Sequence, residues 1–190
     1  GVGIENIDMK AAEKYGVEVR TTKDLYDYET VADLAFGLML CSARKITRMD
    51  RALREKDWLR EDGNDVWGKT LGIVGLGRIG KALARRASGF KMKVLSYDPY
   101  VKSSVVENGI EMVDFNRLLR ESDFISLHMP LTKETYHIID SDQFALMKET
   151  ASSFMNKSQA KSTDRNHRAI INYPGHIIQD PSEIALSFFH

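Results

Sequence analysis

Three glycines lie in the run Gly75-Leu76-Gly77-Arg78-Ile79-Gly80 at the spacing of a phosphate-binding loop. Between a strand and a helix, the first glycine permits a tight turn and the second lets the backbone approach a phosphate. The third lets the helix pack close to the strand. The helix N-terminus adds free N–H groups and the positive end of its dipole. The run therefore predicts a pyrophosphate site, to which the Arg78 side chain can add a charge-assisted contact.

An acidic residue follows at the distance expected for a dinucleotide site. Asp98 ends an apolar segment and lies 23 residues after Gly75. A spacing of about 20 residues is typical of the carboxylate that accepts hydrogen bonds from the adenosine ribose. That carboxylate would repel a 2′-phosphate, so NAD is favoured over NADP as the cofactor. The alternative interpretation is a glycine loop with an unrelated Asp-Pro turn.

A third segment with possible chemistry is His128-Met-Pro-Leu-Thr132, which follows another apolar run. Ligands of open α/β sheets bind at the carboxyl ends of the strands, so this loop is expected beside the cofactor. The alternative is an ordinary loop that ends a strand and carries a surface histidine.

Apolar periodicity predicts the elements that position these residues. Strands are expected over 70–74, 93–97 and 123–128, with helices over 79–90, 113–120 and 141–147, the last capped by Asp140 or Ser141. This alternation predicts an α/β fold: a Rossmann-like doubly wound parallel sheet with helices on both faces, incomplete at its C-terminal end. Towards the N-terminus, we expect a helix over 9–15 that ends at Gly16, a strand over 17–19, and a long helix from about Thr30 with an exposed extension to Trp58.

Composition excludes several classes of function. The 190 residues include 27 Lys+Arg and 27 Asp+Glu, so no net field favours nucleic acid or an anionic membrane. No apolar stretch approaches the roughly 18 residues of a membrane helix. The single cysteine, Cys41, rules out an internal disulfide and favours a reducing, cytoplasmic location. We identify no metal site.

Several motifs together resemble the D-isomer-specific 2-hydroxyacid dehydrogenase family, which includes phosphoglycerate dehydrogenase. The resemblance covers residues 1 to about 151, and it implies an NAD-binding domain over 1–151. Its strongest part is the run from Trp67 to Lys81. The other matching segments are Gly1–Asp8, Glu29–Asp33, Tyr97–Tyr100, and Asp123–Thr132 with Thr135.

The resemblance also implies a set of roles for individual residues. Arg78 and Ile79 would meet the pyrophosphate through their backbone, and Asp98 would hold the ribose. Tyr97 and Pro99 would border the adenosine, while the cofactor cleft would be lined by His128, Met129, Pro130 and Thr135. The family reaction transfers a hydride between NAD(H) and a 2-hydroxy or 2-keto acid. In the family, the helix that begins near Thr30 contributes to a dimer interface, which implies a homodimer.

The sequence departs from the family in its substrate half. The segment that forms most of the family's substrate domain precedes the Gly1-Val-Gly turn, so we expect these 190 residues to lack that domain. Residues 152–190 differ from the family pattern, either because they diverged or because they are read out of frame. Ser158 or Gln159 stands where the family has the arginine that binds the substrate carboxylate, and neither can form its bidentate clamp. His176 is the one candidate catalytic acid/base; the alternative for it is a surface histidine in a turn.

Two functions follow from these observations. In the first, the chain is the NAD-binding portion of an oxidoreductase for 2-hydroxy acids and is not competent alone. In the second, it is a non-catalytic NAD(H)-binding module with a dimerising or sensing role.

Overall fold

The computed structural model describes residues 7–20, 27–102, 105–106, 109–130, 132–155 and 170–172. Its helices are α1 (Met9–Lys14), α2 (Asp27–Ala43), α3 (Ile46–Arg54), α4 (Arg78–Ser88), α5 (Phe115–Glu121) and α6 (Ser141–Leu146). Its strands are β1 (Thr70–Val74), β2 (Lys93–Tyr97), β3 (Val105–Val106), β4 (Ile110–Met112), β5 (Phe124–Leu127), β6 (Ser152–Met155) and β7 (Ile170–Asn172). Among the described residues, no helix is long and apolar enough to cross a bilayer.

The strands form one sheet in the order β3-β4-β2-β1-β5-β6-β7. All neighbours are parallel except β3 and β4. The chain builds outward from β1 through β2 to β4, then crosses to the other side of β1 to form β5. The order therefore reverses between β1 and β5, which is where ligands bind in sheets of this kind. The predicted Rossmann-like parallel sheet is confirmed.

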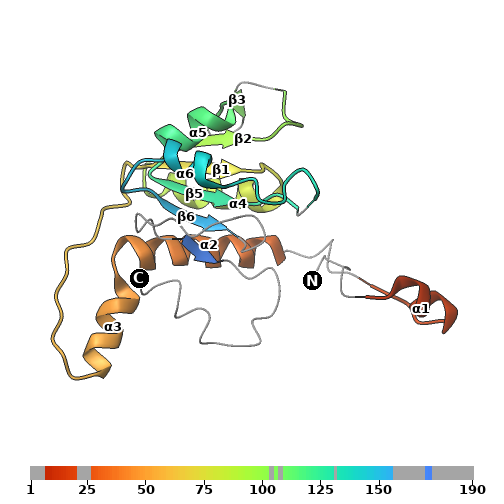
Figure 1. Cartoon of the computed structure of the whole chain (residues 1–190), viewed down its shortest axis with the longest axis horizontal. Helices are drawn as coiled ribbons and strands as arrows, with labels where there is room; N and C mark the ends of the chain where they lie inside the picture. The colour runs from red at the N-terminus through yellow and green to blue at the C-terminus, as the bar shows by residue number, and fades with distance from the viewer. Residues whose placement is uncertain are drawn as a thin grey trace.

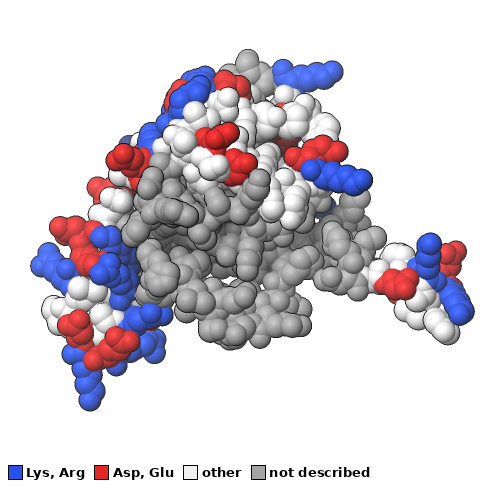
Figure 2. All heavy atoms as spheres, in the orientation of Figure 1, with Lys and Arg blue, Asp and Glu red and all other residues white. Residues whose placement is uncertain are grey.

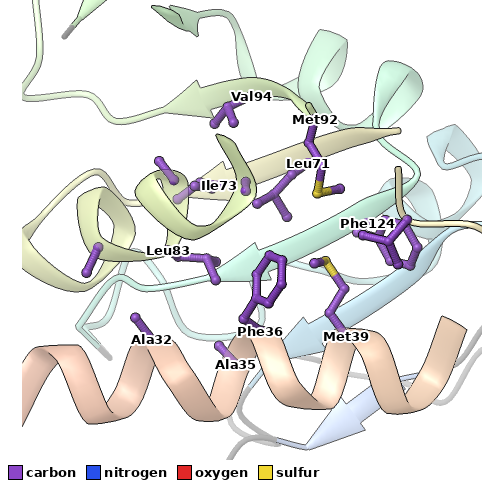
Figure 3. Close-up of a cluster of buried hydrophobic side chains, with 14 of the residues drawn as sticks. Ala32, Ala35, Phe36, Met39, Leu71, Ile73, Leu83, Met92, Val94 and Phe124 are labelled. Carbon is purple, nitrogen blue, oxygen red and sulfur yellow. The ribbon is translucent and has the colours of Figure 1, made fainter. Parts of the chain in front are cut away.

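Helices cover both faces of the sheet, as Figure 1 shows: α2 and α4 lie on one face, α5 and α6 on the other. Because successive strand residues point to opposite faces, Leu71 and Ile73 of β1 pack with α2 and α4, whereas Val74 packs with α5 and α6. Phe36 and Met39 of α2 point toward the sheet in the first of these clusters (Figure 3). The core thus fixes both layers against the central strand.

Ion pairs add to the apolar contact between α2 and α4. The Arg86 guanidinium of α4 donates to the Glu29 carboxylate at 2.8 Å and to Asp33 at 2.7 Å, both on α2. It also donates to the Glu29 backbone carbonyl at 3.1 Å, and Arg85 forms a further ion pair with Glu29. The Glu29–Asp33 segment, which resembled the family without an assigned function, therefore binds the helix that follows the glycine loop.

The predicted helical extension is present as a separate helix and ends at Arg54 rather than at Trp58. Helix α2 ends at Ala43, Lys45 adopts a left-handed conformation with φ of 53°, and α3 begins at Ile46. The cause is non-local: the Asn64 N–H donates to the Ala43 carbonyl at 2.7 Å, so the returning loop satisfies a carbonyl at the end of α2. Figure 2 shows acidic and basic side chains interspersed over α3.

Two smaller expectations also change. Residues 17–20 lie outside any helix or strand, so the predicted strand over 17–19 is wrong. The helix predicted from Val113 begins at Phe115, because the Asp114 carboxylate accepts a hydrogen bond from Arg117 N at 2.9 Å and caps it. The helix over 9–15 is confirmed by α1, and Gly16 follows it with φ of +65°. Asp140, rather than Ser141, caps α6 and forms a capping box with Gln143.

The contact between β1 and α5 yields the first prediction, on Gly72→Ala. A Cβ at Gly72 would lie 2.7 Å from Leu118 Cδ2 and would also collide with Ser122 Oγ, both buried. Overpacking of this kind costs about 1–3 kcal/mol. Urea unfolding should show this loss. Gly89→Ala is the matched control, because its Cβ would make only an ordinary contact of 3.5 Å and its φ of −63° suits alanine. Equal stability of the two variants would contradict the packing described here.

Candidate cofactor site

The candidate site forms where the carboxyl ends of three parallel strands meet. β1 lies between β2 and β5. At the end of β1, the Gly75 N–H donates to the Tyr97 carbonyl at 2.9 Å, which ties the glycine loop to β2. The His128 N–H donates to the Val74 carbonyl at 2.7 Å, which ties the loop after β5 to the same strand end. The three sequence segments singled out for chemistry therefore converge at the point where the strand order reverses.

Two of the three glycines are required by close packing. Gly75 has φ of +95°, and a Cβ there would lie 2.8 Å from the His128 carbonyl oxygen. A Cβ at Gly80 would collide with the Gly75 carbonyl oxygen and lie 3.1 Å from Ile73 Cγ2. Any side chain at either position would therefore push the loop away from β5 or push α4 away from β1.

The middle glycine faces open space. A Cβ at Gly77 would meet nothing within 4 Å, and no side chain caps the N-terminus of α4, which begins at Arg78. Open space in front of an uncapped helix start suits an anion, since the first N–H groups of a helix have no intrahelical partner. These features fit the pyrophosphate of a dinucleotide. The Arg78 guanidinium lies over the Tyr28 ring, 5.5 Å from its centroid.

Asp98 follows β2 and lies beside the glycine loop. Its Oδ2 accepts a hydrogen bond from Leu76 N at 2.8 Å, and its Oδ1 accepts one from Tyr100 N at 2.9 Å. A carboxylate oxygen has two acceptor positions, so each oxygen retains one for a ribose hydroxyl. Of its neighbours, Tyr97 is half-buried with its ring 5.3 Å from the Phe115 ring, whereas Pro99 is exposed.

The loop after β5 is held by side-chain hydrogen bonds. His128 Nε2 lies 2.8 Å from the Oγ of Ser126, which is buried in β5. Burial lowers the pKa of His128 to about 4, so the imidazole is neutral at pH 7. Met129 packs at the edge of the α5–α6 core cluster. Further along, Thr135 Oγ1 donates to the Pro130 carbonyl at 2.7 Å and accepts from Thr132 N at 2.7 Å.

The structure thus brings most of the predicted residues to one edge of the sheet, and His176 lies outside the described residues. Sequence reasoning missed two partners of these residues. One is Ser126, which the two-residue period of a strand places on the same face as His128. The other is the Leu76 amide, whose bond to Asp98 joins two segments and has no local signal in the sequence.

His128 should make stability depend on pH. In the unfolded chain its imidazole takes up a proton near the usual pKa of 6.5, whereas in the folded chain it stays neutral down to about 4. Over that interval the unfolded state binds more protons, so the free energy of unfolding falls as the pH falls. Between pH 7 and pH 5, the His128 contribution to this fall is about 2 kcal/mol.

Urea unfolding at both pH values measures this effect. His128→Gln should reduce the pH dependence by that amount, and the control His137→Gln, from the same loop, should retain it. An unchanged pH dependence in His128→Gln would contradict the assignment of the effect to this imidazole.

Comparison with known proteins identifies relatives of this chain. Residues 36–172 match the model of the family described as D-isomer specific 2-hydroxyacid dehydrogenase, NAD binding domain. The chain is 47% identical over 171 residues to a glyoxylate reductase of Korarchaeum cryptofilum (strain OPF8), a match that covers 86% of this chain and 51% of that protein. The chain therefore spans about half the length of the curated relatives it matches.

Solved structures of D-lactate dehydrogenases are also similar to this chain. The apo-structure of D-lactate dehydrogenase from Escherichia coli superposes with a TM-score of 0.75 at 37% identity, over 84% of this chain and 52% of that one. A D-lactate dehydrogenase with NAD+ from Lactobacillus jensenii superposes with a TM-score of 0.69 at 32% identity, over 84% of this chain and 49% of that one. Given the family match, the sheet order and the glycine loop at the strand reversal, this chain belongs to the D-isomer-specific 2-hydroxyacid dehydrogenases and carries their NAD-binding domain.

Proposed function

We propose that this chain is the NAD-binding portion of an oxidoreductase that transfers a hydride between NAD(H) and a 2-hydroxy or 2-keto acid. The observation that carries the proposal is the open, uncapped start of α4 at Gly77, beside the Asp98 carboxylate. An anionic pyrophosphate and a ribose with free hydroxyls are complementary to these two features. The names of the relatives, a glyoxylate reductase and D-lactate dehydrogenases, support 2-keto acids as the substrate class.

Each predicted site residue has a proposed role in holding the cofactor. The backbone N–H groups of Arg78 and Ile79 bind the pyrophosphate, for which Gly75, Gly77 and Gly80 leave room. Asp98 accepts hydrogen bonds from the ribose hydroxyls, and Tyr97 and Pro99 border the adenosine. The loop with His128, Met129, Pro130 and Thr135 lines the cleft on the β5 side. Bound NAD supplies the hydride acceptor of the reaction, and NADH its donor.

Catalysis of the full reaction also needs groups that bind and orient the substrate, and none of the described site residues is assigned this role. Because the chain covers about half of its relatives, we propose that 1–151 supplies the cofactor half and that a substrate domain is needed for turnover. The sheet itself continues past Ala151 into β6 and β7. His176, Ser158 and Gln159 lie outside the described residues, and the catalytic role of His176 stays a prediction.

A second candidate function is a non-catalytic NAD(H)-binding module with a dimerising or sensing role. Ser158 or Gln159 at the position of the family's arginine favours it, because neither side chain carries the positive charge that orients a substrate carboxylate. Turnover of any 2-keto acid by the purified 190-residue chain would exclude this alternative and the expectation that the chain is not competent alone.

Gly77→Asp tests the cofactor site. Aspartate is a favourable helix N-cap, so the melting temperature should be unchanged or higher. Its carboxylate would occupy the position proposed for the pyrophosphate, and a loss of about 1.4 kcal/mol already lowers affinity tenfold. We expect NADH affinity, measured by fluorescence titration, to fall at least by this factor.

Asn64→Asp is the matched control for this variant. It adds the same charge in the loop before β1, which lies at the opposite edge of the sheet. NADH affinity should therefore stay at the wild-type value in the control. Unchanged affinity in Gly77→Asp would reject the proposed phosphate site, and failure of the wild-type chain to bind NADH would reject the proposed function.

We further propose that the chain forms a homodimer through α2, the helix that contains Thr30, and that it is cytoplasmic. Leu34 of α2 is 47% exposed and Leu53 of α3 is 58% exposed, and exposed apolar side chains of neighbouring helices favour association. Cys41 is a free, half-buried thiol, which suits a reducing compartment.

Leu34→Glu tests the dimer. A buried carboxylate without a partner strongly opposes association, so this variant should sediment as a monomer where the wild type sediments as a dimer. Tyr100→Glu places the same charge at another exposed position, on the loop after β2, and should leave the sedimentation coefficient unchanged. A monomeric wild type, or a dimeric Leu34→Glu, would rule out α2 as the interface.

A further inference from the structure

We propose that Asp98 is also a positioning residue for the glycine loop, which it holds in its phosphate-binding shape before any cofactor is bound. This inference rests on the proposed function, because it assigns a second role to a residue of the same site. It adds support of the loop to the ribose contact that the sequence pattern predicts for this carboxylate.

The geometry at Leu76 carries the proposal. Leu76 is 3% exposed, and its backbone N–H donates to Asp98 Oδ2 at 2.8 Å across 22 positions of sequence. A buried amide without an acceptor is costly, so removal of the carboxylate destabilises this loop conformation. The second oxygen accepts from Tyr100 N at 2.9 Å, which fixes the carboxylate to the turn after β2. Asp98 thus bridges two backbone segments that the cofactor must contact together.

The same bond divides the backbone amides of the loop between two functions. The Gly75 N–H donates to the Tyr97 carbonyl and the Leu76 N–H donates to Asp98. These two amides anchor the loop to β2. The amides from Gly77 onward, at the uncapped start of α4, are the ones left to face a phosphate. The two anchored amides therefore set the orientation of the phosphate-binding amides that follow them.

A ligand that lacks the adenosine ribose distinguishes ribose contact from loop support, because the two roles predict different affinities in Asp98→Ala. Reduced nicotinamide mononucleotide retains the nicotinamide, one ribose and one phosphate. If Asp98 contacts only the adenosine ribose, Asp98→Ala leaves the affinity for this mononucleotide unchanged and lowers the affinity for NADH. If Asp98 also holds the loop, both affinities fall, because the phosphate amides lose their fixed orientation.

Residue-resolved amide hydrogen exchange tests loop support without any ligand. In Asp98→Ala, protection of the Leu76 amide should fall by about tenfold, the change expected for a lost hydrogen bond to a charged acceptor. The Gly75 amide is an internal control, since its acceptor is the Tyr97 backbone carbonyl, and it should stay protected. Tyr100→Ala is the control variant, because it removes an exposed ring and retains the backbone N–H.

The combined outcomes distinguish this inference from the proposed function. Selective loss of Leu76 protection together with weaker mononucleotide binding supports the inference. Unchanged Leu76 protection, equal loss at Gly75, or an unchanged mononucleotide affinity overturns it, while NADH binding by the wild type still supports the cofactor site. A wild type that binds no NADH overturns the proposed function, and the exchange result then still decides whether Asp98 holds the loop.

Discussion

The arrangement of the site depends on the close approach of Gly75 to the backbone at the end of β5. A side chain at this position would lie 2.8 Å from the His128 carbonyl oxygen, and its φ of +95° is one that other residues rarely adopt. This approach keeps β1 and β5 adjacent at the strand reversal. The glycine loop and His128 lie together because of it, and the hydrogen bonds from Gly75 N to Tyr97 O and from Leu76 N to Asp98 bring the end of β2 to the same place.

The central elements could be predicted because local signals and burial agree there. β1 and β2 have the predicted bounds, 70–74 and 93–97. Each is a short apolar run in the interior of a parallel sheet and ends at a residue that breaks the pattern, Gly75 or the Asp98-Pro99 pair. The placement of Asp98 beside the loop followed from this register, since parallel strands of equal length end at the same edge.

The features that sequence reasoning missed are set by partners distant in the chain. At the end of α2, the Ala43 carbonyl accepts a hydrogen bond from the Asn64 N–H. The ion pairs that add to the apolar contact between α2 and α4 come from Arg86. Strand β4 has three residues, too few for a periodic signal. Likewise, the Leu76 amide carries no sequence signature, because every residue but proline has one. Its importance follows from the burial of Leu76 and from its hydrogen bond to Asp98.

The sheet beyond Ala151 shows that continuation of the fold does not by itself establish catalytic activity. β6 and β7 pair in parallel and the family match extends to residue 172, although the segment between them is rich in polar residues. Backbone hydrogen bonds make this pairing, so it places few demands on side-chain identity. Substrate recognition instead requires particular side chains, and neither Ser158 nor Gln159 could form the charged, bidentate clamp that an arginine makes with a carboxylate. Continuity of the sheet is therefore no evidence for turnover, whereas the proposed cofactor site is built from the ends of β1, β2 and β5 and from the start of α4.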